Sequence, residues 1–344
     1  MMSRIRAGLL EWGSVDVLRA AQIGDRIDRE GQVHNGSDVV WGGRHRLFLD
    51  TKRYAGKHMM AYSQTKITED LYAARDRMGG QIVDCVADVR LHDITTDAPF
   101  MTYIVDEQSY RLDCDYIAGC DGFHGVSRRS IPASVLTTYE KIYYPFGWLG
   151  VLSETPPLPG LVYARHERGF ALASIRNPMP SRYYIQCDLE DSLDAWPDER
   201  FWEELKMRFP PEVADRIVTG PTIEKSIAPL RSFVAEPMRY GRLFLAGDAA
   251  HIVPPTGAKG LNLAISDTFY LARAMTQYYG DGETDYLDRY SDMALRRAWG
   301  AARFSWWMTF IIAPFSRPRR IRSPGPGSRV GLYCVFRSRF DLDV

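Results

Sequence analysis

The sequence carries no excess of charge of either sign, because Lys+Arg and Asp+Glu each number 43. Proteins that bind nucleic acid or anionic membranes through charge usually have a basic surplus, so neither partner is expected. Long hydrophobic runs are also missing, since the most apolar stretch, 306–315, is too short to cross a bilayer. The opening residues, 1–6, contain no apolar signal core.

Cysteine is scarce and has no pairing pattern. The five cysteines are odd in number and contain no Cys-x-x-Cys spacing, which argues against a disulfide framework and against a zinc or other metal site. Reduced thiols and the missing signal core together predict a cytoplasmic protein. The remaining composition, 45% hydrophobic and 25% charged, is typical of a globular chain with room for two domains.

The most informative stretch is 241–264. A short apolar run, 243–246, has the character of a buried strand and is closed by Gly247. Asp248 follows at once, which predicts a carboxylate at the carboxyl end of a strand, where open α/β sheets bind ligands. The Pro-Pro-Thr-Gly-Ala-Lys-Gly loop then leads into a helix at Leu261, whose free N–H groups would suit an anionic group. An ordinary strand–turn–helix corner is the alternative, and the length of the string disfavours it.

A second stretch, 111–128, is predicted to be a strand that runs into Asp121-Gly122. A tight Asp-Gly turn is common, so this dipeptide alone would say little. Further on, 144–224 is rich in strand patterns, with one helix near 198–209. Within it Ser174, Arg176 and Tyr184 alternate with a period of two and are predicted to share one face of a sheet.

Other segments give local predictions. Residues 39–49 form a hairpin with a Gly-Gly turn. Residues 64–80 form a helix that ends at Gly79-Gly80 and presents Ile67, Leu71, Ala74 and Met78 on one face. Strands are predicted around 82–86, 89–92 and 101–105.

Taken together, these stretches resemble the flavoprotein aromatic hydroxylases, and among them those that act on 4-hydroxybenzoate. The resemblance runs from Arg4 to about Thr309 and is most specific at 117–125, 144–150, 225–234 and 241–264. It implies an α/β fold with mixed α+β content: an FAD/NAD(P)-binding Rossmann-like domain of the glutathione-reductase type, interleaved with a β-sheet substrate domain. The implied ranges are an FAD-binding domain at 1–35, 60–143 and 230–281, a substrate domain at 36–59 and 144–229, a helical segment at 282–310, and a disordered tail at 311–344.

The resemblance also implies an activity. FAD, reduced by NADPH or NADH, would react with O2 and hydroxylate 4-hydroxybenzoate to 3,4-dihydroxybenzoate through a flavin C4a-hydroperoxide. Arg176 would hold the substrate carboxylate as a forked ion pair, helped by Ser174 and Tyr184. Tyr163, with a pKa near the ordinary ~10, would accept the substrate phenol's hydrogen bond and help to remove its proton. His34 would stand at the outer end of a proton relay. A homodimer is expected.

The implied site residues fall into four groups. The catalytic residues are Tyr163, His34 and Pro255. The substrate-binding residues are Tyr163, Ser174, Ile175, Arg176, Tyr184, Pro255 and Thr256. The FAD-binding residues are Arg4, Ile5, Arg6, Ala7, Gly8, Leu9, Gln64, Asp121, Asp248, Gly260, Leu261 and Asn262. The residues for the nicotinamide nucleotide are Arg6, His124 and Arg231.

The sequence departs from the family pattern at both ends. The family opens with a strand–loop–helix unit that carries Gly-x-Gly-x-x-Gly, and this spacing occurs nowhere here. We therefore expect a chain that starts after that unit, with a reading-frame change near residue 310; a solvated basic tail is the alternative for 316–329. Such a chain, made as written, is expected to be insoluble or colourless. Two other functions stay open: a hydroxylase of another hydroxybenzoate, and a catalytically inactive fragment that at most binds an aromatic acid.

Overall fold

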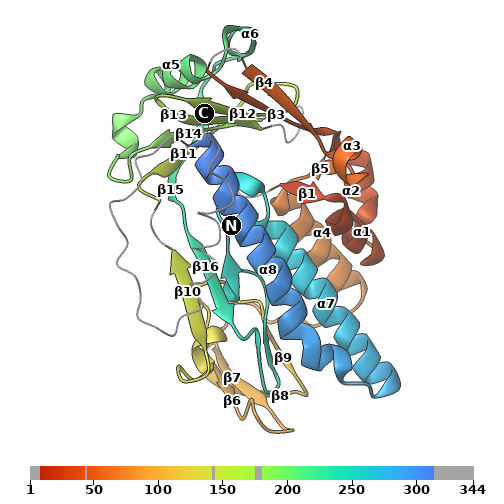
Figure 1. The fold of residues 1–344 in the computed structure, drawn as a ribbon. Coiled ribbons are helices and arrows are strands. Elements are labelled where there is room, and N and C mark those ends of the chain that lie inside the picture. Colours follow the sequence, from red (N-terminus) through yellow and green to blue (C-terminus); the bar gives the residue numbers. More distant parts are fainter. Residues whose placement is uncertain (1–7, 43–44, 142–143, 175–179, 314–344) are drawn as a thin grey trace, which may run out of the picture. The chain divides into compact units, whose positions relative to one another are not determined.

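A computed structural model describes residues 8–42, 45–141, 144–174 and 180–313. The chain divides into two units, Met1–Pro314 and Phe315–Val344, and the described residues all lie within the first. Figure 1 shows the arrangement of its helices and strands.

The largest element is a seven-stranded sheet in the order β15-β11-β14-β13-β12-β3-β4. Its pairs are antiparallel except for β12 and β3, which run parallel. The predicted hairpin at 39–49 is confirmed, because β3 pairs with β4 in this sheet. The strands are β3 (Gly36–Trp41), β4 (His45–Asp50), β11 (Gly147–Ser153), β12 (Leu161–His166), β13 (Gly169–Ser174), β14 (Ser181–Cys187) and β15 (Thr222–Pro229).

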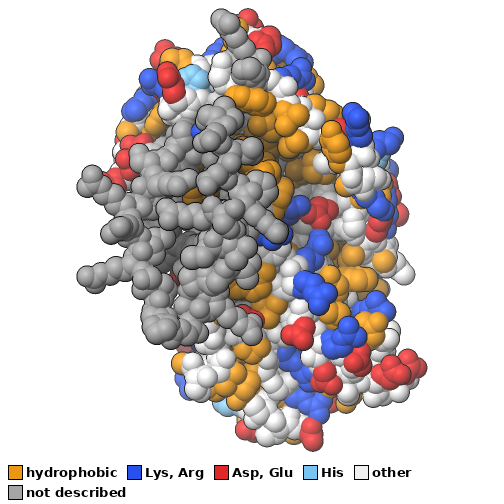
Figure 2. Space-filling model, viewed as in Figure 1, with side chains coloured by type: hydrophobic (Ala, Val, Ile, Leu, Met, Phe, Trp, Pro, Cys, Tyr) orange, Lys and Arg blue, Asp and Glu red, His pale blue; other side chains and the backbone are white. Residues whose placement is uncertain are grey.

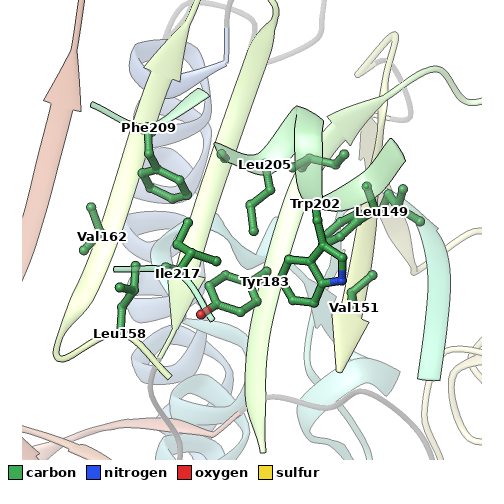
Figure 3. Packing of buried hydrophobic residues seen from close by; sticks show 14 of the residues in the cluster. Leu149, Val151, Leu158, Val162, Tyr183, Trp202, Leu205, Phe209 and Ile217 are labelled. Atoms are coloured by element: carbon green, nitrogen blue, oxygen red, sulfur yellow. The ribbon is translucent and has the colours of Figure 1, made fainter. Parts of the chain in front are cut away.

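One face of this sheet forms a core with helix α5 (Asp198–Arg208), as Figure 3 shows. Leu149, Val151 and Tyr183 point from the strands toward Trp202 and Leu205 of the helix. The helix is amphipathic because its apolar residues recur at intervals of three and four, so one side can be buried. The opposite face of the sheet is therefore the one left for other contacts.

Four three-stranded sheets complete the described part of the unit. Their orders are β17-β18-β9, β1-β5-β2, β10-β16-β19 and β6-β7-β8. The strands are β1 (Leu9–Glu11), β2 (Gln32–His34), β5 (Met59–Ala61), β6 (Ala87–His92), β7 (Phe100–Val105), β8 (Gln108–Asp113), β9 (Ile117–Gly119), β10 (Thr137–Lys141), β16 (Ser232–Glu236), β17 (Arg239–Tyr240), β18 (Leu243–Leu245) and β19 (His251–Ile252).

Two long helices, α7 (Gly260–Asp281) and α8 (Asp285–Ile312), pack side by side (Figure 1). A cluster of buried residues from α7, α8, β16 and β18 joins them to two of the small sheets. The other helices are α1 (Trp12–Ala20), α2 (Gly24–Glu30), α3 (Thr51–Ala55), α4 (Gln64–Arg77) and α6 (Pro211–Ala214), and the short 3-10 turns are η1 (Arg128–Ser130), η2 (Leu193–Ala195), η3 (Gly247–Ala249) and η4 (Pro255–Gly257).

Three local predictions were wrong in detail. No strand forms at 82–86 within the described residues: Cys85 has a φ of 57°, which breaks an extended run. Helix α4 buries Ile67 and Ala74, but Leu71 is 46% exposed and Met78 67%, because only one narrow side of the helix meets the cluster around α1 and α2. The predicted strand at 111–119 is two strands, β8 and β9.

Strand β18 leads directly into the turn that carries Asp248. Within the described residues β18 is paired on both sides, antiparallel to β17 and parallel to β9. The seven-stranded sheet draws its strands from 36–50 and 147–229, within the predicted substrate-domain ranges, and the division into domains stays a prediction. No described helix is both long and apolar enough to span a membrane.

Candidate functional site

Two acidic residues lie at the same edge of one small sheet. Strands β9 and β18 run parallel in register, with Gly119 opposite Leu245. Asp121 follows the first strand and Asp248 follows the second, so both come at carboxyl ends of parallel strands. This is the edge at which α/β sheets bind ligands. The two most informative stretches of the sequence therefore meet at one place.

The turn that carries Asp248 needs its glycine. Gly247 has a φ of 61°, and a Cβ there would approach the Cβ of Ala264 in α7 to 3.3 Å. The Gly247 amide donates to the Asp267 carboxylate at 2.9 Å. Burial raises the pKa of Asp248, and nearby His251 opposes the rise. Asp248 has no hydrogen-bond donor within the described residues, so its carboxyl group is available to hydroxyl groups of a ligand.

Helix α7 begins beside this turn, after a strained loop. Ala258 has a φ of 51°, an uncommon conformation for a residue other than glycine. The Asn262 side chain is 1% exposed and holds the loop in place. It accepts from the Glu11 amide at 2.8 Å and from the Ser14 hydroxyl at 2.7 Å, and it donates to the carbonyls of Leu9 (3.0 Å) and Ala258 (2.7 Å). Gly260 and Leu261 form the first turn, whose free N–H groups suit an electronegative ligand edge.

The Asp121 loop folds back on itself. Asp121 accepts a hydrogen bond from the Ser127 amide at 2.8 Å. Its carboxylate lies so close to Gly125 that a Cβ there would come within 2.0 to 2.4 Å of it, which explains the glycine. Arg128, which sequence reasoning missed, donates to the Ala249 carbonyl at 2.8 Å. This arginine therefore ties the Asp121 loop to the Asp248 turn.

His124 and Arg231, predicted for the nicotinamide nucleotide, both contact Phe123. The His124 ring lies 5.1 Å from the Phe123 ring, and the Arg231 guanidinium lies 4.5 Å from the same ring. Arg231 also forms an ion pair with Glu140 at 3.3 Å. His124 is exposed and Arg231 partly so. The structure thus brings two predicted residues together on an aromatic platform that was not predicted.

The open face of the seven-stranded sheet carries the predicted substrate residues. Tyr163 lies opposite Leu172, and Leu172 lies opposite Tyr184, so these side chains share one face. Ser174 is two residues beyond Leu172 and has the same orientation. The expected shared face is therefore observed for Ser174 and Tyr184. This face is opposite the one that packs on α5.

Tyr163 is buried and donates to the Thr256 carbonyl at 3.0 Å. Burial and the proximity of Tyr184 raise its pKa above the ordinary range, so the expected match to a phenol near pKa ~10 is corrected for this site. The Thr256 hydroxyl is 2.7 Å from that of Thr309 in α8. Pro255, the residue before Thr256, is exposed. The loop 254–260 thus joins the open sheet face to the Asp248 turn.

Arg182 is a second residue that sequence reasoning missed. It lies opposite Ser174 in β14 and is 2% exposed, with its guanidinium 5.5 Å from the Tyr184 ring. Burial lowers its pKa. Its position two residues before Tyr184, on the same face, was the signal available in the sequence.

His34 is buried at the end of β2, and burial lowers its pKa, which favours the neutral imidazole. It precedes β3, whose Val39 lies opposite Tyr163. Gln64 opens helix α4, and Gly8 and Leu9 lead into β1. The predicted residues Arg4, Ile5, Arg6, Ala7, Ile175 and Arg176 lie outside the described residues.

Figure 2 shows how side chains are distributed on one face of the molecule. Hydrophobic side chains gather in its upper part, near the seven-stranded sheet, whereas acidic and basic side chains alternate over α7 and α8. An apolar wall with a few polar groups is typical of a small-molecule site.

Comparisons with known proteins agree with this geometry. A family model described as an FAD binding domain matches residues 2–305. The p-hydroxybenzoate hydroxylase of Acinetobacter baylyi is 50% identical over 314 residues, which cover 91% of this chain and 77% of that protein. A 3-(3-hydroxy-phenyl)propionate/3-hydroxycinnamic acid hydroxylase of Mycolicibacterium smegmatis is 25% identical, and there this chain spans only 46% of the relative.

Solved structures share the fold at lower identity. A probable FAD-dependent monooxygenase from Pseudomonas aeruginosa, pqsL, superposes with a TM-score of 0.75 at 19% identity, over 90% of this chain and 87% of that one. A complex of aklavinone-11 hydroxylase with FAD and aklavinone gives a TM-score of 0.73 at 19% identity, over 91% of this chain and 63% of that one. The chain therefore belongs to the FAD-binding family of flavoprotein hydroxylases.

Proposed function

We propose that this chain hydroxylates 4-hydroxybenzoate to 3,4-dihydroxybenzoate with FAD, NAD(P)H and O2. The observation that carries the proposal is the bond from Tyr163 to Thr256, because it joins the open sheet face to the loop between the Asp248 turn and α7. This bond supports a substrate position adjacent to the proposed flavin position. The 50% identity to a p-hydroxybenzoate hydroxylase supports this substrate over another hydroxybenzoate and over an inactive fragment.

The described residues fit an FAD molecule. Asp248 is a carboxylate without a donor, as a ligand rich in hydroxyl groups requires, and the first turn of α7 offers free amides to the electronegative edge of a flavin. Bound FAD would supply the oxygen-transfer chemistry, and the protein supplies binding, orientation and exclusion of water. Asp121, Gln64 and residues 4–9 complete the proposed FAD site.

The substrate would be held by its two ends. Arg176 binds the carboxylate, helped by Ser174 and Tyr184. Tyr163 turns from the Thr256 carbonyl to the substrate phenol and shares its proton, with His34 as the outer proton acceptor. The raised pKa of Tyr163 means that it stays a neutral hydroxyl until the substrate is bound, so no charge is buried in the empty site.

Further parts of the proposal rest on the family. His124, Arg231 and Arg6 bind the nicotinamide nucleotide, with NADPH or NADH as the reductant. The FAD-binding domain comprises 1–35, 60–143 and 230–281, and the substrate domain 36–59 and 144–229. The protein acts in the cytoplasm as a homodimer.

The proposal is tested by substrate-stimulated oxidation of NADPH and NADH in the presence of FAD. We expect stimulation by 4-hydroxybenzoate and formation of 3,4-dihydroxybenzoate, identified by mass spectrometry. 3-Hydroxybenzoate and benzoate serve as matched controls, because each keeps the carboxylate and lacks the para hydroxyl. Equal product formation from 3-hydroxybenzoate would favour a hydroxylase of another hydroxybenzoate. Binding of 4-hydroxybenzoate without any turnover would favour a catalytically inactive fragment.

The carboxylate anchor has its own test. A charge-assisted hydrogen bond contributes ~1.5–3 kcal/mol, so Arg176→Ala should weaken 4-hydroxybenzoate binding by about tenfold to a few hundredfold. Arg176→Lys should recover only part of this, because the planar fork is lost. Normal substrate binding by the Arg176→Ala protein in an equilibrium titration would contradict the assignment.

A further inference from the structure

A buried histidine–aspartate pair lies directly behind the Asp248 turn. The Asp267 carboxylate, on the second turn of α7, accepts from the Gly247 amide at 2.9 Å. The same oxygen lies 2.7 Å from Nε2 of His251. One carboxylate oxygen on a helix thus holds both ends of the segment Gly247–His251, and Asp248 lies between those two ends. The pair has no part in the chemistry proposed above.

Burying the His251–Asp267 pair costs desolvation free energy, which indicates that the pair has a specific role. Both side chains are 1% exposed. A buried carboxylate is tolerated only when it accepts hydrogen bonds or pairs with a cation. An apolar side chain would be enough if this position only had to fill space in the core. The gain is a charge-assisted hydrogen bond to a backbone amide, which is shorter and stronger than a neutral one. Two titratable groups interact with Asp267: Cys120, the residue after β9, and Tyr290 of α8, and both have a pKa raised chiefly by desolvation.

The rest of the segment is held from other sides. The Ala250 amide donates to the Gly247 carbonyl at 2.9 Å, and the Ala235 amide of β16 donates to the Ala250 carbonyl at 2.8 Å. Arg128 donates to the Ala249 carbonyl. Two groups of the segment contact the Asp267 side chain of α7: the His251 ring, and the Gly247 amide at the point where the chain leaves β18. The direction in which Asp248 leaves the strand is therefore set by Asp267.

We propose that Asp267, oriented by His251, is a positioning residue that presets the Gly247–Asp248 turn for the ribityl hydroxyl groups of FAD. The inference rests on the proposed assignment of Asp248 to the flavin. Without the carboxylate the Gly247 amide loses its acceptor and the turn can rotate. FAD must then order the Gly247–Asp248 turn when it binds. This ordering costs free energy and weakens the affinity for FAD, although no direct contact with FAD is removed.

The test uses isosteric changes in the full chain. Asp267→Leu keeps the branched shape of the side chain, although it is somewhat larger, and removes the acceptor, whereas Asp267→Asn keeps one acceptor oxygen for the Gly247 amide. Ser153→Ala is the control, because it removes a buried hydrogen bond of 2.8 Å to the Pro221 carbonyl in the seven-stranded sheet, away from the turn. For each protein the FAD dissociation constant is measured by flavin fluorescence, and the melting temperature is measured without FAD.

We expect Asp267→Leu to raise the FAD dissociation constant about tenfold or more, and Asp267→Asn to stay within about threefold of the unchanged chain. Ser153→Ala should lower the melting temperature and leave FAD affinity unchanged. If Asp267→Leu does not fold, His251→Ala replaces it and should weaken FAD binding relative to Ser153→Ala. Equal affinities for the Leu and Asn proteins, or for His251→Ala and Ser153→Ala, would overturn the inference.

The inference and the proposed function fail separately. If the unchanged chain binds FAD but does not hydroxylate 4-hydroxybenzoate, the proposed activity is wrong and the variants still decide the role of Asp267. If the unchanged chain binds no FAD, both are wrong for this protein.

Discussion

At the scale of single residues, burial decides how Tyr163 behaves, and partial desolvation raises the pKa of Asp248 although this residue is exposed at the surface. Tyr163 is enclosed by the sheet and by loop 254–260, so its hydroxyl is a neutral donor with a raised pKa. Asp248 keeps a carboxyl group with a raised pKa, to which no described residue donates a hydrogen bond. Neither property follows from the residue type alone, since a fully solvated tyrosine or aspartate would have an ordinary pKa.

The first prediction concerns Tyr163→Phe. Substrate binding should stay within a few-fold, because the ring remains, but turnover should fall by about tenfold or more, because the hydroxyl serves proton removal. Steady-state kinetics and a substrate titration separate the two effects. Tyr139→Phe, at a partly exposed tyrosine of β10, is the control. An equal loss of binding and turnover would make Tyr163 a substrate-orienting group instead.

The second prediction concerns Asp248→Asn and its pH dependence. Because the folded-state pKa of Asp248 is raised, ionisation of this group costs stability once the pH exceeds the unfolded pKa of ~3.9. The variant without FAD should therefore be more stable than the unchanged chain at neutral pH, and this advantage should vanish in acid. FAD should bind about tenfold more weakly, since a neutral acceptor replaces a charged one.

Thermal melts at several pH values and an FAD titration test this second prediction. Asp194→Asn, at an exposed aspartate, should change neither quantity. A lower stability of Asp248→Asn at neutral pH would contradict the raised pKa.

At the scale of elements, a partly buried ion-pair cluster helps to fasten helix α5 to the sheet. Glu204 forms ion pairs with Arg168 and, at 3.1 Å, with Arg208. Arg208 also donates to the carbonyls of Phe170 (2.9 Å) and Gln186 (2.8 Å) in β13 and β14. Burial alone would raise the pKa of Glu204, but the hydrogen bonds and charges of the two arginines lower it. The helix is thus locked onto the face opposite the proposed site.

The third prediction is that Glu204→Gln lowers the free energy of unfolding by about 3 kcal/mol at neutral pH, because Arg208 is left buried without its counter-ion. A lowered carboxyl pKa contributes stability above the unfolded pKa of ~4.3 that is lost as the pH falls through the folded value. The difference between the two proteins should therefore shrink below about pH 4. Urea unfolding at several pH values measures this difference in the free energy of unfolding. Glu203→Gln is the control, because Glu203 is an exposed neighbour on the same helix. A pH-independent difference would rule out the ionised pair as its cause.

At the scale of the whole molecule, the site depends on contacts between distant parts of the chain. Asn262 joins the start of α7 to β1 and α1 through Glu11, Ser14 and Leu9, and Arg128 joins the Asp121 loop to the Asp248 turn. Tyr163 joins the large sheet to the loop before α7. The proposed FAD and substrate positions therefore lie where several sheets meet.

The fourth prediction is that Asn262→Ala lowers the free energy of unfolding by about 2–4 kcal/mol, since several buried polar groups lose their partner together. FAD binding should weaken as well, because the loop before α7 is no longer held. Urea unfolding and an FAD titration provide the measurements. Thr268→Ala, on the same helix, removes an exposed local bond to the Ala264 carbonyl and should stay within about 0.5 kcal/mol. A similar loss in both variants would make Asn262 an ordinary helix position.

The sequence alone determined the local features of this protein. The turn at Gly247-Asp248, the helix after it, the hairpin at 39–49 and the shared face of Ser174 and Tyr184 all follow from residues close together in the chain, where glycine, proline and periodicity restrict the backbone. The family resemblance rested on the same local strings and is confirmed. The strand predicted at 82–86 failed because local β propensity does not supply a pairing partner.

Only the tertiary structure decided which distant residues meet. Asp267 reaches Gly247 across twenty residues of sequence, and Arg128 reaches Ala249 across 121. Burial is also a property of the assembled fold: it sets the pKa of Tyr163, leaves Leu71 exposed and encloses Arg182. No periodicity encodes these contacts, because they arise from the packing of separate sheets and helices, and the partners are chosen by geometry and desolvation after the local elements exist.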